Sequence, residues 1–169
     1  MTKSIDELGR LCGALLKAQP GPDGRQKVCD LLKPLLADNA FVDKAIPEST
    51  GERELLYEDP ELKFCIFAEH KGGAKIGKPH DHGPSWAIYG QAAGETEMTE
   101  WELVKAPSKD GPGKVRRARI YKMTPGSAYV YNEGVLHSPS RTAPTRLIRV
   151  EGVNLDQFRA LRPEYEEVP

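Results

Sequence analysis

The sequence has few cysteines, and their spacing excludes two classes of small protein. Cys12, Cys29 and Cys65 are odd in number, and no two of them form a CxxC pair. Neither a disulfide framework nor a structural zinc site built on cysteine is therefore expected. Each cysteine has apolar neighbours, among which a thiol behaves as a small hydrophobic side chain. We interpret all three as buried, reduced thiols.

The sequence also lacks an excess of charge of either sign. Its 24 lysines and arginines balance 25 aspartates and glutamates, so there is no surplus to attract a phosphate backbone or an anionic membrane. The N-terminal residues contain no apolar signal segment, and no stretch reaches the roughly 18 consecutive apolar residues of a transmembrane helix. We expect a soluble cytoplasmic protein that binds neither nucleic acid nor membrane.

The length of the chain suits one domain. A chain of 169 residues buries roughly 70% of its unfolded surface when it folds, which is enough for one core. We expect a helical part at residues 1–40, a β-barrel at 41–153 and a short helix and tail at 154–169. Residues 1–169 would together form a single domain.

Two amphipathic helices are predicted before the barrel. From Ser4 to about Lys17 the apolar residues recur at three- and four-residue steps, and Ser4 and Glu7 have the spacing of a capping box. A second apolar rhythm begins near Asp23, and Pro34 should kink or split that helix. Neither helix carries an obvious reactive group, so both are interpreted as packing elements.

The rest of the chain is typical of short strands separated by turns. Strands are expected at 63–68, 96–104, 119–123 and 127–131, with a polar hairpin loop at 107–113. This spacing, with no helices between the strands, favours an antiparallel barrel or jelly roll. The exposed edges of such a barrel would allow a homodimer. Asn154 is the expected N-cap of a final short helix.

Three histidines form the most informative pattern. His80 and His82 are two residues apart, and on extended chain such side chains project from the same face. His137, at the end of a distant strand, could close a metal site with them. A surface pair or a hydrogen-bonded pair is the alternative explanation of His-x-His alone.

The surroundings of these histidines resemble the two motifs of the cupin superfamily. His80, His82 and Gly94 fit the first motif, and Ala87 lies where that motif has an acidic metal ligand. Gly126, Gly134 and His137 fit the second motif, with Asn132 in the place of its proline and Arg141 in the place of its asparagine. The resemblance implies an all-β core with flanking helices, a cupin double-stranded β-helix (jelly-roll barrel) preceded by two N-terminal α-helices. Its metal site would be reduced to three histidines.

Among cupins, the chain is similar to the thiol dioxygenases, a group that includes cysteine dioxygenase and 3-mercaptopropionate dioxygenase. Matching segments occur in the same order over roughly residues 50 to 140. The similarity implies iron(II), dioxygen and a small anionic substrate, with a thiol becoming a sulfinate. Imidazole ligands alone would also suit zinc, nickel or copper. Ala87 excludes the cysteine–tyrosine cross-link of cysteine dioxygenase.

The resemblance implies further site residues around the metal. Arg53 lies near the position of an arginine that grips the substrate carboxylate in that group, a task suited to a guanidinium. Trp86, Tyr89 and Tyr131 could line the cavity, although aromatic residues on barrel strands more often belong to a core, and we select Trp86 and Tyr131 as substrate contacts. Behind the ligands we expect His70 and an ion pair between Arg149 and Glu151, for which a solvated strand face is the alternative. Asp81 or Glu133 could accept the second ring N–H groups.

One departure leaves other functions open. Residues 146–152 contain none of the Ser, His and Tyr that thiol dioxygenases carry on the strand after the third ligand. The alternatives are a three-histidine cupin that cleaves a dicarbonyl compound, a zinc-dependent hydrolase or isomerase, and a cupin that binds a small molecule without turning it over.

Overall fold

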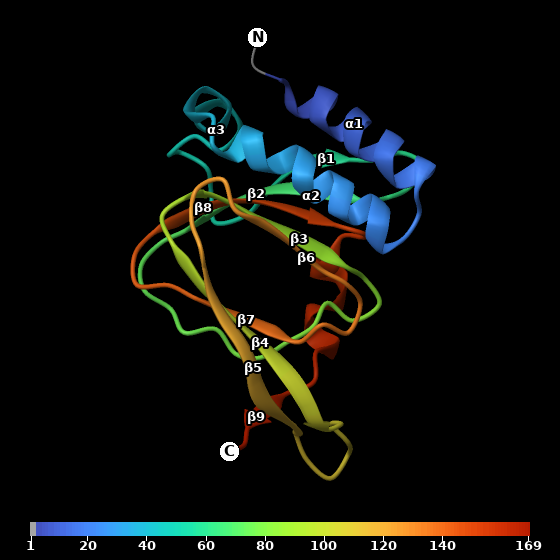
Figure 1. The fold of residues 1–169 in the computed structure, drawn as a ribbon, viewed down its shortest axis with the longest axis vertical. Helices are drawn as coiled ribbons and strands as arrows, with labels where there is room; N and C mark the ends of the chain where they lie inside the picture. Colours follow the sequence, from blue (N-terminus) through green and yellow to red (C-terminus); the bar gives the residue numbers. More distant parts are fainter. Residues whose placement is uncertain (1–2) are drawn as a thin grey trace.

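The computed structural model describes residues 3–169, and of residues 159–161 it describes only the backbone. Three N-terminal helices cover one of two facing β-sheets, and the chain ends beside the other sheet (Figure 1). The helices are α1 (Ile5–Ala18), α2 (Pro22–Leu36) and α3 (Asn39–Ala45). No helix of the described residues is long and apolar enough to cross a bilayer.

The helices largely follow the sequence pattern, with two differences. The Ser4 hydroxyl accepts a hydrogen bond from the Glu7 N–H at 3.1 Å, as a capping residue should. Pro34 does not split α2, which continues to Leu36, because a proline in the last turn removes a single hydrogen bond close to where the helix ends. The short helix α3 was not predicted. It begins after Asp38, whose carboxylate accepts a hydrogen bond from the Ala40 N–H.

Nine strands of the described residues form the two sheets. The first sheet has the order β1-β2-β8-β3-β6, and the second has the order β7-β4-β5-β9 (Figure 1). The strands are β1 (Glu54–Glu58), β2 (Cys65–Lys71), β3 (Ala87–Ala93), β4 (Thr96–Lys105), β5 (Gly113–Met123), β6 (Ala128–Tyr131), β7 (His137–Ser140), β8 (Thr145–Glu151) and β9 (Tyr165–Glu167). All pairings are antiparallel except that of β5 with β9.

The strand order is that of a jelly roll. Residues 75–80 are extended and pair with the chain around β7 through the bridges Lys75↔Arg141 and His80↔His137, so they act as a further edge strand. The barrel then has eight segments, numbered along the chain from β2 as the first and residues 75–80 as the second. One sheet contains the first, eighth, third and sixth segments in that order, and the other contains the second, seventh, fourth and fifth. This order is produced by two Greek keys. The predicted cupin-type all-β core with flanking helices is confirmed, with three helices in place of two.

The two faces of the first sheet belong to two different apolar clusters. On β3, Ile88 points toward the helices, whereas Ala87 and Tyr89 belong to a second apolar cluster inside the barrel with Met98, Met123 and Tyr131. The larger cluster lies between the helices and the outer face of the sheet and includes Leu8, Val28, Leu32, Phe41, Ile66, Ile88 and Ile148. The three cysteines are buried and free, as predicted. Because the helices supply most of the core, the inner face can carry polar groups.

The C-terminal segment differs in detail from the prediction. Residues Leu155–Leu161 form a 3₁₀-helix, and the Asn154 side chain accepts a hydrogen bond from the Asp156 N–H at 3.1 Å. The chain then returns to the barrel, where β9 pairs with the start of β5. This strand was not predicted, since three residues after a proline carry little periodic signal.

Candidate metal centre

The three predicted histidines lie together. His80 and His137 are bridge partners whose backbones exchange two hydrogen bonds of 3.0 and 2.9 Å, and His82 follows His80 by two residues. One nitrogen of each ring lies within 4.8 Å of the nitrogens of the other two, and no Asp, Glu or Cys of the described residues joins this group. Edge-strand pairing therefore places His80 next to His137, and the extended chain between 80 and 82 places the third ring.

Backbone carbonyls fix the orientation of two of the rings. Nδ1 of His80 lies 3.0 Å from the Lys78 carbonyl oxygen, and Nδ1 of His137 lies 2.9 Å from the Val135 carbonyl oxygen. A carbonyl only accepts, so each Nδ1 carries the hydrogen and each Nε2 keeps its lone pair for a metal. Nδ1 of His82 is buried and has no hydrogen-bond partner in the described structure.

The structure corrects the expectation that Asp81 or Glu133 accepts a hydrogen bond from a histidine ring. The Asp81 carboxylate accepts a hydrogen bond from the Gly83 N–H, and Glu133 forms an ion pair with Arg25 at 2.6 Å. Neither carboxylate contacts a histidine ring nitrogen among the described contacts. Main-chain carbonyl oxygens accept the ring N–H hydrogen bonds instead. The types of the side chains do not predict such acceptors.

The donor set fits a metal ion. Burial lowers the pKa of His80 to about 4 and the pKa values of His82 and His137 further below their ordinary value, so the rings are neutral near pH 7, as metal ligands must be. The Nε2 atoms of His82 and His137 lie 3.0 Å apart. Two lone pairs at this distance repel each other unless a proton or a cation lies between them. Iron(II), zinc, nickel or copper would each suit three neutral imidazoles.

Tyr89 completes the cluster and was not among the selected site residues. Its hydroxyl lies 3.2 Å from Nε2 of His137 and 3.3 Å from Nε2 of His82. Burial raises the pKa of this phenol to about 12, so the hydroxyl keeps its proton and can donate it in a hydrogen bond. Ala87 offers no ligand in the acidic slot, but Tyr89 stands two residues further along β3 on the same face. This spacing is the signal in the sequence that could have identified it.

The two other aromatic candidates lie in different places. The Tyr131 ring stacks on His137 with centroids 4.1 Å apart, and its hydroxyl is 2.6 Å from that of Tyr121. Tyr131 thus supports the back of one ligand. Trp86 packs in the apolar core under the helices, beneath the guanidinium of Arg25, and does not line the cavity at the histidines.

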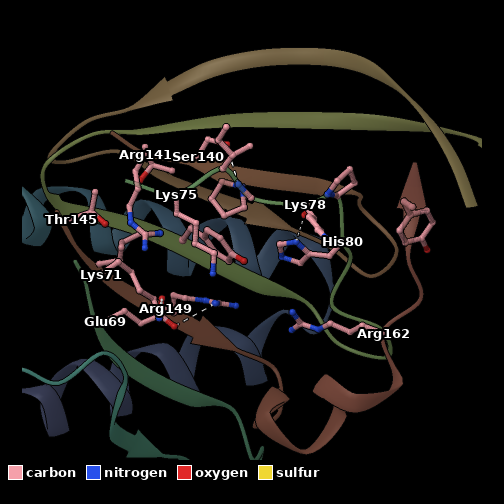
Figure 2. Close-up of a pocket in the computed structure, with 18 of the residues that line it drawn as sticks. Glu69, Lys71, Lys75, Lys78, His80, Ser140, Arg141, Thr145, Arg149 and Arg162 are labelled. Carbon is pink, nitrogen blue, oxygen red and sulfur yellow. Dashed lines mark hydrogen bonds and ion pairs between the residues drawn. The ribbon is translucent and has the colours of Figure 1, made fainter. Parts of the chain in front are cut away.

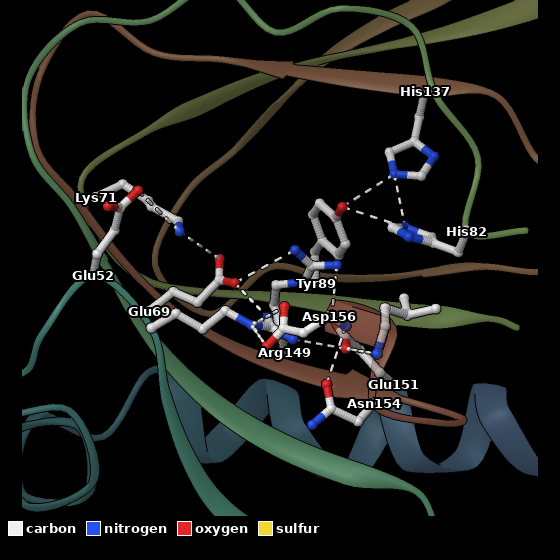
Figure 3. Close-up of polar contacts among 12 residues, drawn as sticks. Glu52, Glu69, Lys71, His82, Tyr89, His137, Arg149, Glu151, Asn154 and Asp156 are labelled. Carbon is white, nitrogen blue, oxygen red and sulfur yellow. Dashed lines mark hydrogen bonds and ion pairs between the residues drawn. The ribbon is translucent and has the colours of Figure 1, made fainter. Parts of the chain in front are cut away.

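A buried ion cluster lies beside the histidines (Figure 3). Arg149 and Glu151 form the predicted ion pair at 2.8 Å, and Arg149 also lies 3.4 Å from Glu69. The guanidinium of Arg53 contacts Glu69 at 2.7 Å, Glu151 at 2.8 Å and Asp156 at 3.2 Å. Burial alone would raise the pKa of Glu69, but the cations around it hold that pKa below its ordinary value. Glu69 is therefore charged, and arginines lie against both glutamates.

Only one of the two arginines reaches the cavity. Arg149, His80 and Tyr89 are among the residues that line a cavity of about 860 Å³ inside the barrel (Figure 2), whereas Arg53 is not. Arg53 instead forms ion pairs with three carboxylates, those of Glu69, Glu151 and Asp156. His70 pairs across the ladder with Arg146, and because it alternates with Glu69 on β2 it lies on the opposite face of the sheet. The structure thus does not bring Arg53 or His70 to the histidines.

Comparisons with known proteins found similarity to solved structures alone. No family model and no curated protein matches the chain. Solved structures that resemble it include KdgF from Halomonas sp. (18% identity, 59% of this chain and 74% of that chain, TM-score 0.42). A protein with a double-stranded β-helix domain from Klebsiella pneumoniae subsp. pneumoniae (15% identity, 65% and 80%, TM-score 0.43) and a cupin-2 domain containing protein from Shewanella frigidimarina (10% identity, 70% and 96%, TM-score 0.44) are similar too. The strand order and the histidine cluster of the chain itself therefore carry its description as a cupin-type jelly roll with a candidate metal centre.

Proposed function

We propose that the chain is a metal-dependent dioxygenase that holds iron(II) with His80, His82 and His137 and oxidises a small anionic thiol to a sulfinate. The observation that carries this proposal is the cluster of three neutral imidazoles with no acidic ligand among the described residues. One of the three, His80, lines a cavity that also contains cationic side chains. Bound iron(II) would supply open coordination positions for substrate and dioxygen.

The reaction is balanced without a further reductant. Both atoms of dioxygen are added to the sulfur of the thiolate, the sulfur loses four electrons, and dioxygen gains four. The protein therefore needs to bind two reactants and to keep the thiol ionised, and it needs no site for an electron donor. A three-ligand set suits this requirement because it leaves more positions open than a four-ligand set.

Arg149 is the residue of this chain that we assign to the substrate anion near the metal. Its guanidinium lines the cavity, and its Nε is buried without a hydrogen-bond partner in the described structure. Glu69 and Glu151 hold it in place through ion pairs. An arginine fixed in this way can donate to a carboxylate with little further loss of side-chain freedom. This assignment replaces Arg53, which does not line the cavity and is paired with Glu69 and Glu151.

Tyr89 is assigned a hydrogen-bonding role at the reacting end of the substrate. Its neutral hydroxyl points to the space shared by two histidine Nε2 atoms. A buried donor at this position can stabilise charge that develops on a reacting atom. The guanidinium of Arg149 packs against a face of the Tyr89 ring, so the hydroxyl has little freedom to turn away from the histidines.

The test is metal analysis combined with oxygen uptake. Protein purified anaerobically is loaded with iron(II) and screened in an oxygen electrode against small thiols that carry a carboxylate, with dicarbonyl compounds as the comparison set. We expect iron-dependent uptake of about one dioxygen per thiol and a sulfinate product. Stoichiometric zinc in the purified protein, with no oxygen uptake from any thiol after iron loading, would overturn the proposal.

A further inference from the structure

The end of the cavity away from the histidines contains two cations, Lys75 and Arg141, that form no ion pair with the carboxylates of the described residues. Lys75 and Arg141 are directly opposite each other, and their backbones exchange two hydrogen bonds of 2.9 Å. Residues opposite each other on antiparallel chains project to the same face with Cβ atoms about 5 Å apart. Both side chains line the cavity. Like charges in this arrangement destabilise the pairing unless an anion lies between them.

A second cross-strand pair, from the other sheet, lines the same end of the cavity. Lys71 on β2 is opposite Thr145 on β8. The side chain of Thr145 is 2% exposed, and its hydroxyl has no hydrogen-bond partner in the part of the chain that the structure describes. A buried hydroxyl is normally paired, so this one is a donor available to a bound group. Figure 2 shows Lys71, Arg141 and Thr145 toward one end of the cavity and His80 toward the other.

The negative charge at this end is already neutralised. Glu52 and Glu69 each lie 3.7 Å from the ammonium nitrogen of Lys71. Neither Lys75 nor Arg141 forms an ion pair with a carboxylate of the described residues. The Nε of Arg141 donates to the Gly73 carbonyl oxygen at 3.0 Å, which orients the rest of the guanidinium. The free cations and the free hydroxyl thus converge on one volume.

We propose that Lys75, Arg141 and Thr145 form an oxyanion subsite that binds a phosphate or carboxylate group. Lys71 lies beside it and contributes charge that the glutamates partly cancel. A guanidinium, an ammonium and a hydroxyl supply donors from three directions, which suits an anion with several oxygens. The subsite is distinct from Arg149 and from the histidines, and nothing in its construction requires a metal.

The position of the subsite specifies the class of substrate. His80 follows Lys75 by five positions, a stretch that spans at most about 16 Å when fully extended. A substrate that contacts both the histidines and this pair has to extend along the cavity between them. The substrate that uses both ends is therefore an elongated molecule, with the group to be oxidised at one end and an anionic group at the other. This assignment rests on the proposed function, whereas the subsite rests on the cavity alone.

The subsite is tested by titrating inorganic phosphate, and separately acetate, into the metal-free full chain at constant ionic strength. Amide chemical shifts in two-dimensional NMR spectra report binding. We expect saturable shifts at Thr145 and Arg141, with phosphate or acetate tighter according to the group the subsite prefers. The K75Q/R141Q double variant should bind about tenfold more weakly or worse, since charge-assisted hydrogen bonds are lost. The K27Q/R10Q variant removes two exposed charges from the helices and should bind like the parent chain.

Thr145→Val provides a second variant of nearly unchanged shape. It should weaken anion binding severalfold while the spectrum of the folded chain is retained. Metal content measured on every variant should equal that of the parent chain, so loss of the subsite and loss of the metal centre are separate results. Absence of saturable shifts with either anion, or equal affinity in K75Q/R141Q and K27Q/R10Q, would overturn the subsite.

Discussion

The guanidinium of Arg149 lies over the ring of Tyr89, with 4.3 Å between its central carbon and the ring centroid. At the other end of that ring, the Tyr89 hydroxyl is 3.2 Å from Nε2 of His137. Arg149 in turn is paired with Glu69 and Glu151 (Figure 3). A single aromatic ring therefore separates the buried ion cluster from the metal centre, and each side can be altered with its own readout.

Glu151→Gln is expected to destabilise the fold. The Glu151 side chain is 1% exposed and pairs with both Arg53 and Arg149, so its loss leaves Glu69 as the one buried carboxylate that these two arginines share among the described ion pairs. Removal of one partner of a buried ion pair costs about 3 to 5 kcal/mol. Urea unfolding of the variant and the parent chain measures the difference in the free energy of unfolding.

Glu102→Gln is the matched control for that comparison. Glu102 pairs with Arg116 at 2.8 Å, but both side chains are more than half exposed. An exposed pair contributes far less than a buried one, because water screens its charges. Equal destabilisation by the two substitutions would show that the ion cluster around Glu151 does not stabilise the fold more than a surface pair does.

Tyr89→Phe is expected to preserve the metal and impair turnover. The substitution removes only the hydroxyl that faces the two histidines, and the ring still packs between Arg149 and Tyr131. Loss of one preorganised donor lowers kcat about tenfold or more. Steady-state oxygen uptake and metal content are measured together, with Tyr129→Phe as the control because that hydroxyl does not contact a histidine among the described contacts. Unchanged kcat in Tyr89→Phe would remove Tyr89 from the reacting end of the site.

Metal-free protein should lose stability as the pH falls below about 6.5. Burial lowers the histidine pKa values in the folded chain, to about 4 for His80 and well below the ordinary value for His137. The unfolded chain therefore binds more protons than the folded chain in this range, and the free energy of unfolding rises with pH. The contribution of His80 to this slope ends near pH 4.

The slope can be assigned to a residue with His137→Gln. The His137 side chain is fully buried, and a group that titrates only in the unfolded chain contributes about 1.4 kcal/mol per pH unit. Urea unfolding of metal-free protein from about pH 7 to about pH 5 should give a shallower slope for the variant by roughly this amount. An identical slope in both proteins would mean that His137 does not stay neutral in the folded state.

The fold could be predicted where the residue pattern is local. The apolar steps after Ser4 and the turn at 107–113 have the expected structure, whereas the strand expected at 119–123 begins six residues earlier, at Gly113. Gly94, identified only from a motif, has φ 71°, and a Cβ there would lie 2.4 Å from the Pro144 carbonyl oxygen, so only glycine fits. The helix α3 and the strand β9 were missed because seven and three residues are too few to show a period.

Only the features of the site that depend on side-chain type and spacing could be predicted from the sequence. The three histidines indicate a metal site by their residue type. The ion pair of Arg149 with Glu151 follows from the spacing of the two residues on one strand. The acceptors of the His80 and His137 rings are main-chain oxygens, which every residue carries. Arg53 and Arg149 both pair with Glu69 and Glu151. Which of the two arginines faces the cavity is a property of the tertiary structure.

The central claim is that three of the four histidines hold one metal ion, and His70 supplies the matched control. Metal content per chain is measured after anaerobic purification for the parent protein and for His80→Ala, His82→Ala, His137→Ala and His70→Ala, each checked for folding by circular dichroism. We predict about one metal per chain in the parent protein and in His70→Ala, and less than about a tenth of that in the other three variants. Full metal content in folded His137→Ala would contradict the account.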